Sequence, residues 1–258
     1  MDLNLTNQVA FVAGSSRGIG KAIAERFLLE GCRTVITGRT VEDIKRVHAE
    51  FTQRFGCDRL MALPGDLTDL STIRHAVLQV QSKWGDIDCA VANIGTGRGQ
   101  SGWDISDSQW TEIFQMNLWS SVRLIPEILA PMVRRQCGSV VFISSITGME
   151  TTAAPLPYSA AKAALLNYAK NLARQVGPYH VRVNSVAPGN ILFPGGSWDR
   201  RKTDNPQTVA DYINAEVPLR RFGRPEEIAD LVVFLSSDRA SFITGSCVVA
   251  DGGQTRSI

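Results

Sequence analysis

A tyrosine and a lysine in the second half of the chain have the spacing of a proton-transfer pair. Tyr158 and Lys162 open a segment with helical patterning, and residues four apart share one face of a helix, so the ammonium can lie beside the phenol. A neighbouring cation lowers the pKa of a phenol from about 10, toward the range useful in acid–base catalysis. Ser145 follows the apolar run 139–144 and can hold a carbonyl oxygen beside this pair. These residues predict proton exchange with a carbonyl or alcohol, although a Tyr–Lys spacing of this kind is common and carries little weight alone.

A glycine-rich turn near the N-terminus has the pattern of a phosphate-binding site. The apolar run 9–13 leads into Gly14, and Gly18 and Gly20 open the next helical segment, 18–30. Glycine permits the tight turn, the close approach of backbone to a ligand, and the close packing of helix on sheet. The start of the helix presents free N–H groups and the positive end of its dipole. Because a strand precedes the turn and a helix follows it, the pattern predicts a dinucleotide site.

Two arginines indicate which dinucleotide is bound. After the second strand, 34–37, dinucleotide-binding folds place an acid to bind a ribose 2′-hydroxyl or an arginine to bind a 2′-phosphate. This chain has Arg39 there and no acid, and Arg17 lies within the glycine-rich turn. Arginine binds phosphate through paired, charge-assisted hydrogen bonds, so we expect NADP(H) as the cofactor. The missing acid also argues against a methyltransferase-like fold.

These motifs together resemble those of the classical short-chain dehydrogenases/reductases, over essentially the full length of the chain. The resemblance depends on the shared order and intervals, including the thirteen residues from Ser145 to Tyr158. It is most marked toward 3-oxoacyl-acyl-carrier-protein reductases, above all in the C-terminal stretch 221–228. The matching motifs are Gly14-x3-Gly18-Ile19-Gly20, Asp66-Leu67, Asn93-Ile94-Gly95, Asn117, Ser145, Tyr158-x3-Lys162 and Pro188-Gly189.

The resemblance implies a role for each of these residues. Tyr158 would be the acid in reduction and the base in oxidation, and Lys162 would lower its pKa and bind the nicotinamide ribose. Ser145 would position the substrate oxygen, and Asn117 would anchor a water relay. The protein would supply geometry and proton transfer to a hydride chemistry that belongs to the cofactor, with no metal. The expected cofactor-binding residues are Gly14, Ser16, Arg17, Gly18, Ile19, Gly20, Arg39, Asp66, Leu67, Asn93, Gly95, Tyr158, Lys162, Pro188, Gly189 and Ile191.

Two positions depart from the family pattern. The glycine-rich turn begins with Ala13 where the family commonly has threonine, which removes a hydroxyl that ties the turn down. Five residues after Pro188, the family commonly has another threonine, and this chain has Phe193. A hydrogen bond toward the cofactor is then absent unless Ser197 or a backbone N–H replaces it.

Apolar runs alternate with amphipathic segments along most of the chain. The expected strands are 9–13, 34–37, 60–63, 88–92, 139–144, 182–187 and 247–250, and the expected helices are 18–30, 41–55, 69–84, 107–135, 158–177 and 225–236. Continuously apolar strands alternating with helices are typical of a parallel sheet covered on both faces. We expect one Rossmann-type α/β domain over 1–258, with about seven strands in the order 3-2-1-4-5-6-7. The unpatterned stretch from 189 to about 206 predicts a substrate flap, extending over about 189–217.

The substrate is less readable than the chemistry. The arginines with which 3-oxoacyl-acyl-carrier-protein reductases grip the acidic carrier would fall at Gln136 and Tyr179, so neither is present. The segments expected to line the substrate space offer hydroxyls, a cation and two indoles, which favours a small polar or sugar-like substrate. The acyl-carrier reductase activity remains the alternative. The expected lining residues are Ser145, Thr147, Thr96, Phe193 and Trp198, with Arg98, Trp103 and Thr151–Thr152 nearby.

Composition excludes several other classes. The net charge of +2 gives no basic surface for nucleic acid or membrane, and no apolar run reaches the roughly 18 residues of a membrane span. The five cysteines and three histidines are scattered, which argues against a zinc site or a disulfide framework and favours the cytoplasm. A non-catalytic NADP(H) sensor would keep the glycine turn and lose the acid–base residues. Family resemblance implies a homotetramer or homodimer formed through segments 107–135 and 158–177 and the last strand.

Overall fold

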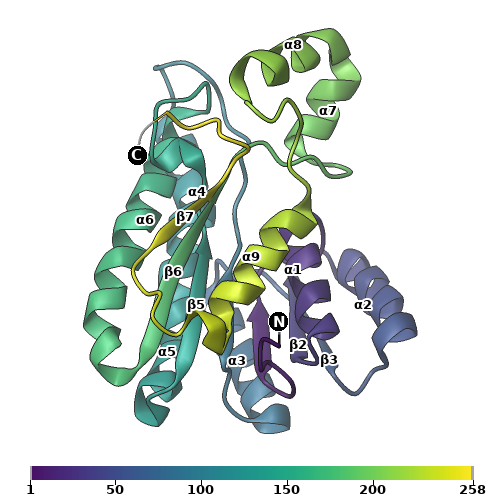
Figure 1. Cartoon of the computed structure of the whole chain (residues 1–258), viewed down its shortest axis with the longest axis vertical. Coiled ribbons are helices and arrows are strands. Elements are labelled where there is room, and N and C mark those ends of the chain that lie inside the picture. Colours follow the sequence, from purple (N-terminus) through teal and green to yellow (C-terminus); the bar gives the residue numbers. More distant parts are fainter. Residues whose placement is uncertain (1, 257–258) are drawn as a thin grey trace.

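The computed structural model describes residues 2–256. It is built around a seven-stranded sheet with the order β3-β2-β1-β4-β5-β6-β7 (Figure 1), and every neighbouring pair is parallel. This confirms the predicted Rossmann-type fold and strand order. Each predicted strand lies within one residue of its observed limits. The strands are β1 (Val9–Val12), β2 (Arg33–Gly38), β3 (Leu60–Pro64), β4 (Cys89–Ala92), β5 (Gly138–Ile143), β6 (Val181–Pro188) and β7 (Cys247–Ala250).

Helices cover both faces of the sheet because its strands are apolar on both sides. Along β1, Ala10 and Val12 pack into the core beneath one set of helices, and Val9 and Phe11 pack into the core beneath the other. This alternation follows from the two-residue period of a strand. The first set is α1 (Gly18–Leu29), α2 (Val41–Phe55) and α9 (Pro225–Ser236), and the second is α3 (Leu70–Trp84), α5 (Ser120–Arg135) and α6 (Leu156–Val176).

The predicted helix 107–135 is divided in the structure. It consists of α4 (Asp107–Phe114), a π-helical turn η1 (Gln115–Trp119) and α5. Its N-cap is Ser106, whose hydroxyl accepts a hydrogen bond from the backbone N–H of Gln109 at 3.4 Å. An added residue in one turn leaves the apolar pattern of a helix nearly unchanged, so the periodicity could not reveal the π turn.

The structure also corrects the unpatterned stretch after β6. The segment contains two helices, α7 (Ser197–Asp204) and α8 (Pro206–Glu216), which stand beyond the carboxyl end of the sheet (Figure 1). Helix α7 buries no residue, and α8 buries only Val209 and Ile213. With so few buried positions, these helices carry almost no apolar periodicity, which is the signal that reveals a helix in a sequence.

Three short 3₁₀ turns lie within residues 2–256, and each connects a helix or strand to the next element. The helices between residues 2 and 256 are not apolar enough over a sufficient length to span a bilayer. The 3₁₀ turns are η2 (Ile146–Gly148), η3 (Gly177–Tyr179) and η4 (Asp238–Ala240).

Candidate active site

A cavity of about 700 Å³ opens at the carboxyl edge of the sheet, between the strand ends and the α7–α8 segment. This is where open parallel sheets bind ligands, because the loops after neighbouring strands gather there. Two of the expected cofactor residues, Gly18 and Gly20, are not part of its wall. The expected catalytic residues Asn117 and Ser145 line it, as do the remaining expected cofactor residues Gly14, Ser16, Arg17, Ile19, Arg39, Asp66, Leu67, Asn93, Gly95, Tyr158, Lys162, Pro188, Gly189 and Ile191.

The glycine-rich turn is tied to both neighbouring strands. Gly14 has a φ of +67°, its N–H donates to the Thr37 hydroxyl at 3.0 Å, and its carbonyl accepts from the Asn93 amide at 2.9 Å. A Cβ at Gly20 would lie 2.2 Å from the Gly14 carbonyl oxygen, so the start of α1 can approach the turn only with glycine there. Thr37 supplies from β2 the hydroxyl that Ala13 lacks, which compensates for the first departure.

The second departure, Phe193, takes a position at the same turn. A Cβ at Gly18 would lie 2.7 Å from the Phe193 ring, so the ring packs directly on this glycine. The ring is partly buried and joins the core cluster beneath α1 and α9. An apolar contact to the turn therefore replaces the hydrogen bond that a threonine would make toward a cofactor. Ser197 begins α7 and also lines the cavity.

The groups available to a cofactor phosphate are the start of α1 and two arginines. No side chain among residues 2–256 caps α1, which leaves its first N–H groups free toward the cavity. Arg17 is the N-cap residue and Arg39 follows β2, and both are exposed where they line the cavity. Asp66 and Leu67 follow β3 and also line the cavity. This donor set fits a dinucleotide with an additional phosphate on its adenosine ribose.

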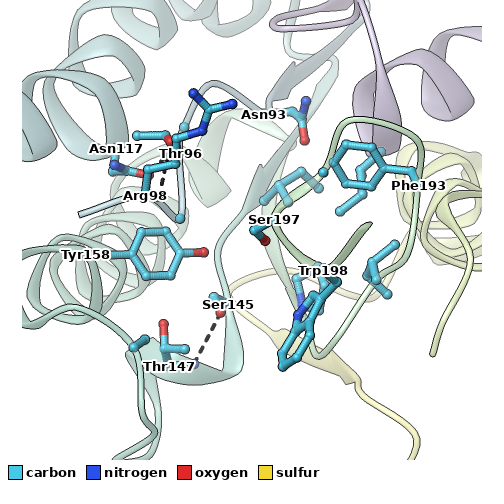
Figure 2. Close-up of a pocket in the computed structure, with 18 of the residues that line it drawn as sticks. Asn93, Thr96, Arg98, Asn117, Ser145, Thr147, Tyr158, Phe193, Ser197 and Trp198 are labelled. Atoms are coloured by element: carbon cyan, nitrogen blue, oxygen red, sulfur yellow. Dashed lines mark hydrogen bonds between the residues drawn. The ribbon is translucent and has the colours of Figure 1, made fainter. Parts of the chain in front are cut away.

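Figure 2 shows the Tyr158 phenol extending into the pocket above Ser145, across from Phe193 in the loop before α7 and Trp198 on α7. The Ser145 hydroxyl accepts a hydrogen bond from the Thr147 N–H at 3.3 Å. Lys162 Nζ lies 5.8 Å from the centroid of the Tyr158 ring and donates to the Ile143 carbonyl at 2.8 Å. Two hydroxyls and an ammonium thus meet at one end of the cavity, as the spacing predicts.

Burial governs the pKa values of this pair. It lowers the pKa of the Lys162 ammonium to about 8. It raises the pKa of the Tyr158 phenol, and a side-chain hydrogen bond with Ser145 acts in the opposite direction. The sequence predicts that the lysine lowers the pKa of the tyrosine, whereas in the chain alone desolvation of the phenol dominates. Tyr158 therefore keeps its proton at neutral pH.

Asn117 lies in the π turn and is fully buried. Its side-chain N–H donates to the Ile113 carbonyl at 3.0 Å, and its side-chain oxygen accepts from the Thr96 N–H at 3.0 Å. A Cβ at Gly95 would lie 2.6 Å from that oxygen and 3.3 Å from Lys162 Nζ, so Asn117 and Lys162 meet across this glycine. The π turn thus turns the asparagine toward the ammonium.

The loop after β6 completes the cavity on the side of the α7–α8 segment. Gly189 must be glycine, because a Cβ there would lie 2.6 Å from Asp251. Ile191 is buried and forms an isolated parallel bridge with Gly223. Pro188 ends β6 beside them. These contacts fix the loop next to Tyr158 and Ser145.

The substrate end differs in part from its prediction. Thr96, Arg98, Thr147, Thr152, Phe193 and Trp198 line the cavity as expected. Trp103 and Thr151 do not: Trp103 is 86% exposed, in the loop between β4 and α4, and Thr151 is also exposed. The sequence missed several polar or aromatic lining residues. Four of these have no local signal, since each reaches the cavity only through the fold. They are Thr37, Asn190, Tyr212 and Gln254.

No group of three or more histidine, cysteine, aspartate or glutamate residues within 2–256 could hold a metal ion. The five thiols are free, and Cys32 and Cys89 are buried. No histidine, cysteine or glutamate of residues 2–256 lines the cavity, and the aspartates that do are Asp66 and Asp204.

The chain is similar to known proteins over nearly its whole length. The family described as enoyl-(acyl carrier protein) reductase matches residues 13–255. The 3-oxoacyl-[acyl-carrier-protein] reductase FabG of Aquifex aeolicus (strain VF5) is 33% identical over 257 residues, which cover 98% of this chain and 99% of the relative. FabG of Escherichia coli (strain K12) is 32% identical over 255 residues, which cover 97% of this chain and 98% of the relative. The L-sorbose reductase of Gluconobacter frateurii, solved with NADPH and L-sorbose, is 31% identical, with a TM-score of 0.93 and full coverage of both chains.

The depressed pKa of Lys162 predicts a pH-dependent stability. Between pH 8 and 10 the unfolded chain, whose lysine has an ordinary pKa near 10.5, holds more proton than the folded chain. The free energy of unfolding of the cofactor-free protein should therefore rise with pH in this window relative to Lys162→Met, by up to about 1.4 kcal/mol per pH unit. Urea unfolding at several pH values measures this difference. Lys170→Met, an exposed change on the same helix, should give a curve parallel to the unsubstituted protein. Parallel curves for Lys162→Met as well would contradict the prediction.

Proposed function

The chain belongs to the short-chain dehydrogenase/reductase family and is an oxidoreductase acting on carbonyl or CH–OH groups with a nicotinamide cofactor, and we propose that it is specific for NADP(H) and for a small polar or sugar-like substrate. The observation that carries this proposal is the meeting of Tyr158, Ser145 and Lys162 at one end of the cavity whose other end is the glycine-rich turn. A non-catalytic NADP(H) sensor finds no support, since the acid–base residues are present and gathered.

In this proposal Ser145 and Tyr158 act on the substrate oxygen. The Ser145 hydroxyl holds the carbonyl oxygen, and Tyr158 donates its phenolic proton to that oxygen during reduction. A bound nicotinamide supplies the hydride. The raised pKa of Tyr158 keeps it protonated for reduction. In oxidation the Tyr158 phenolate, which the Lys162 ammonium favours, accepts the alcohol proton and becomes the phenol, while the hydride of the alcohol carbon goes to the nicotinamide. Asn117 links this end of the site to a water relay.

The proposed cofactor residues fit an NADP(H) molecule lying along the carboxyl edge of the sheet. Ser16, Ile19 and the free N–H groups of α1 would bind the pyrophosphate, and Arg17 and Arg39 the 2′-phosphate. Asp66 and Leu67 would border the adenine. Asn93 and Gly95 would border the central part, with Pro188, Gly189 and Ile191 beside the nicotinamide. We treat residues 189–217, which include α7 and α8, as a flap over this end.

The substrate proposal depends on what the carrier-binding positions lack. Gln136, at the C-terminal end of α5, and Tyr179 are both exposed and uncharged, so the surface offers no arginine at either place. The alternative function, reduction of a 3-oxoacyl group on acyl-carrier protein, is favoured by the FabG relatives. The L-sorbose reductase, which matches the whole chain, favours the polar substrate.

The five free thiols support a reducing compartment such as the cytoplasm.

Removing the phenolic hydroxyl tests the proposed chemistry. Tyr158→Phe should lower kcat for NADPH-dependent reduction of a generic diketone by about 100-fold or more, because the proton donor is lost. The loss of NADPH absorbance measures the rate, and NADPH binding should remain. Tyr179→Phe, which changes an exposed tyrosine outside the cavity, is the matched control. Tight NADPH binding without turnover of any carbonyl by the unsubstituted protein would instead indicate a sensor.

Reversing the charge at Arg39 tests the cofactor preference. Arg39→Asp should raise the Kd for NADPH by about tenfold or more and change the Kd for NADH little, because a repelled 2′-phosphate replaces a bound one. Fluorescence titration with each cofactor gives both constants. Lys45→Asp makes the same charge change on α2 away from the cavity and should leave both unchanged. Equal weakening of NADPH and NADH by Arg39→Asp would place Arg39 elsewhere than at the 2′-phosphate.

We also propose a homotetramer or homodimer. Strand β7 forms one edge of the sheet and is only partly covered, and nearby Phe242 is fully exposed. Leu156 on α6 and Trp119 in the π turn are about half exposed. Apolar groups on an uncovered edge strand and on neighbouring helices favour association. Light scattering of the purified chain should give the mass of a dimer or tetramer, and Phe242→Glu should shift it toward the monomer. A monomer before substitution would contradict this.

A further inference from the structure

The C-terminal segment closes the substrate end of the cavity. After β7, Gly252 accepts a hydrogen bond from the Leu219 N–H at 3.1 Å, which holds this segment against the end of the flap. The Arg256 N–H donates to the Glu150 carboxylate at 2.9 Å, in the loop that follows Ser145. The segment therefore joins the flap to the loop that carries the catalytic serine, and Gln254 lies between these two attachments.

Gln254 forms a hydrogen-bonded chain with residues from two other segments. Its side-chain oxygen accepts from the Asn190 side-chain N–H at 2.8 Å, and its own N–H donates to the Tyr212 hydroxyl at 2.9 Å. Asn190 lies in the loop after β6, next to Ile191, and Tyr212 lies on α8. All three side chains line the cavity that contains Tyr158 and Ser145. The chain thus crosses from the body of the protein to the flap along the wall of the cavity.

These three groups have hydrogen-bonding capacity left over. A primary amide has two N–H donors and an oxygen with two lone pairs, and a phenol both donates and accepts. Within residues 2–256, the bonds described use one donor of each amide and leave the Tyr212 proton and the Asn190 side-chain oxygen without a partner. Uncommitted donors and an acceptor therefore lie together on the cavity wall, where a ligand can reach them.

The adjoining wall is apolar and held in place. Trp198 stacks on Tyr212, with ring centroids 5.1 Å apart and an interplanar angle of 23°. The centroids of the Trp198 and Phe222 rings are 5.4 Å apart, and the Arg201 guanidinium lies 5.0 Å from the centroid of the Trp198 ring. Because the aromatic stack fixes the Tyr212 ring while Gln254 fixes its hydroxyl, the polar groups have a defined geometry. A small cavity with rigid aromatic walls and a few directed polar groups is typical of specific small-molecule recognition.

We propose that Asn190, Gln254 and Tyr212 form a distal subsite that binds hydroxyl groups of the substrate on carbons beyond the reacting one. The substrate class is then a polyhydroxylated ketone and the corresponding polyol. This rests on the proposed function, because the subsite has meaning only if a carbonyl or alcohol is held at Tyr158 and Ser145. A substrate without such hydroxyls leaves the directed donors unpaired, and a site built for a hydroxyl discriminates strongly against an analogue that lacks it.

The test compares two substrates in variants that remove single polar groups. Tyr212→Phe keeps the ring and its stack on Trp198, and Gln254→Leu keeps the approximate size of the side chain. Each should lower kcat/KM for ketohexoses by about tenfold or more while changing kcat/KM for 2,3-butanedione by less than about twofold. NADPH binding and thermal unfolding of each variant show that the cofactor site and fold are intact. Tyr179→Phe and Gln207→Leu, at positions outside the cavity, should behave as the unsubstituted protein.

The outcomes separate this inference from the proposed function. If Tyr212→Phe and Gln254→Leu lower kcat/KM equally for ketohexoses and for 2,3-butanedione, the subsite is overturned, because a merely structural role of Asn190, Gln254 and Tyr212 affects both substrates alike. The proposed chemistry still stands in that case, provided that turnover of 2,3-butanedione depends on Tyr158. A clear preference for a β-ketoacyl pantetheine thioester over ketohexoses would overturn the substrate class. No turnover of any carbonyl, 2,3-butanedione included, would overturn the proposed function itself.

Discussion

The active-site geometry depends on a buried ammonium that joins α6 to β5. Lys162 donates to the Ile143 carbonyl at 2.8 Å, and the Ser144 hydroxyl donates to the Lys162 carbonyl at 3.1 Å. The contact is close enough that a Cβ at Gly148 would lie 2.7 Å from the Lys162 backbone. Tyr158 is one turn before Lys162 and Ser145 is one residue after Ser144, so this double attachment sets the two hydroxyls relative to each other. A charge in so little solvent is costly, and the lowered pKa of the lysine reflects that cost.

The dinucleotide end shows how a family pattern can change in its residues and keep its geometry. The hydroxyl lost at Ala13 is supplied by Thr37 from the neighbouring strand, which accepts from the Gly14 N–H. Asn93 holds the other side of the same turn. Both side chains reach the turn because β2 and β4 flank β1 in the sheet. The turn is therefore stabilised from both sides of the point where the strand order reverses, which is where this fold binds its ligand.

Specificity, in contrast, lies in the least regular part of the chain. The segment from Phe193 to the end of α8 contacts the rest of the protein through Phe193 on Gly18, Trp198 on Phe222, and Tyr212 through Gln254 to Asn190. Helix α7 buries nothing, so its attachment to the body has a small free energy. This sparse burial supports the proposed role of residues 189–217 as a flap. The candidate catalytic groups on α6 and just after β5 are, in contrast, held by the buried attachments of Lys162 and Ser144.

The sequence by itself determined the fold class through a local signal, and the family resemblance of its motifs predicted the strand order and the candidate catalytic groups. Continuously apolar strands show the parallel sheet, Gly14 and Gly20 mark a turn that only glycine can form, and Tyr158 and Lys162 share a helix face by their spacing. The tertiary structure alone decided the helices α7 and α8, the exposure of Trp103 and the raised pKa of Tyr158. It alone also decided that the Thr37 hydroxyl takes the place of the one that Ala13 lacks, and that hydrogen bonds link Asn190 through Gln254 to Tyr212. Burial sets that pKa, and the other features depend on contacts between residues far apart in sequence or on helices with few buried positions. Local periodicity and spacing carry no information about which distant side chains will meet or how much water they will lose when they do.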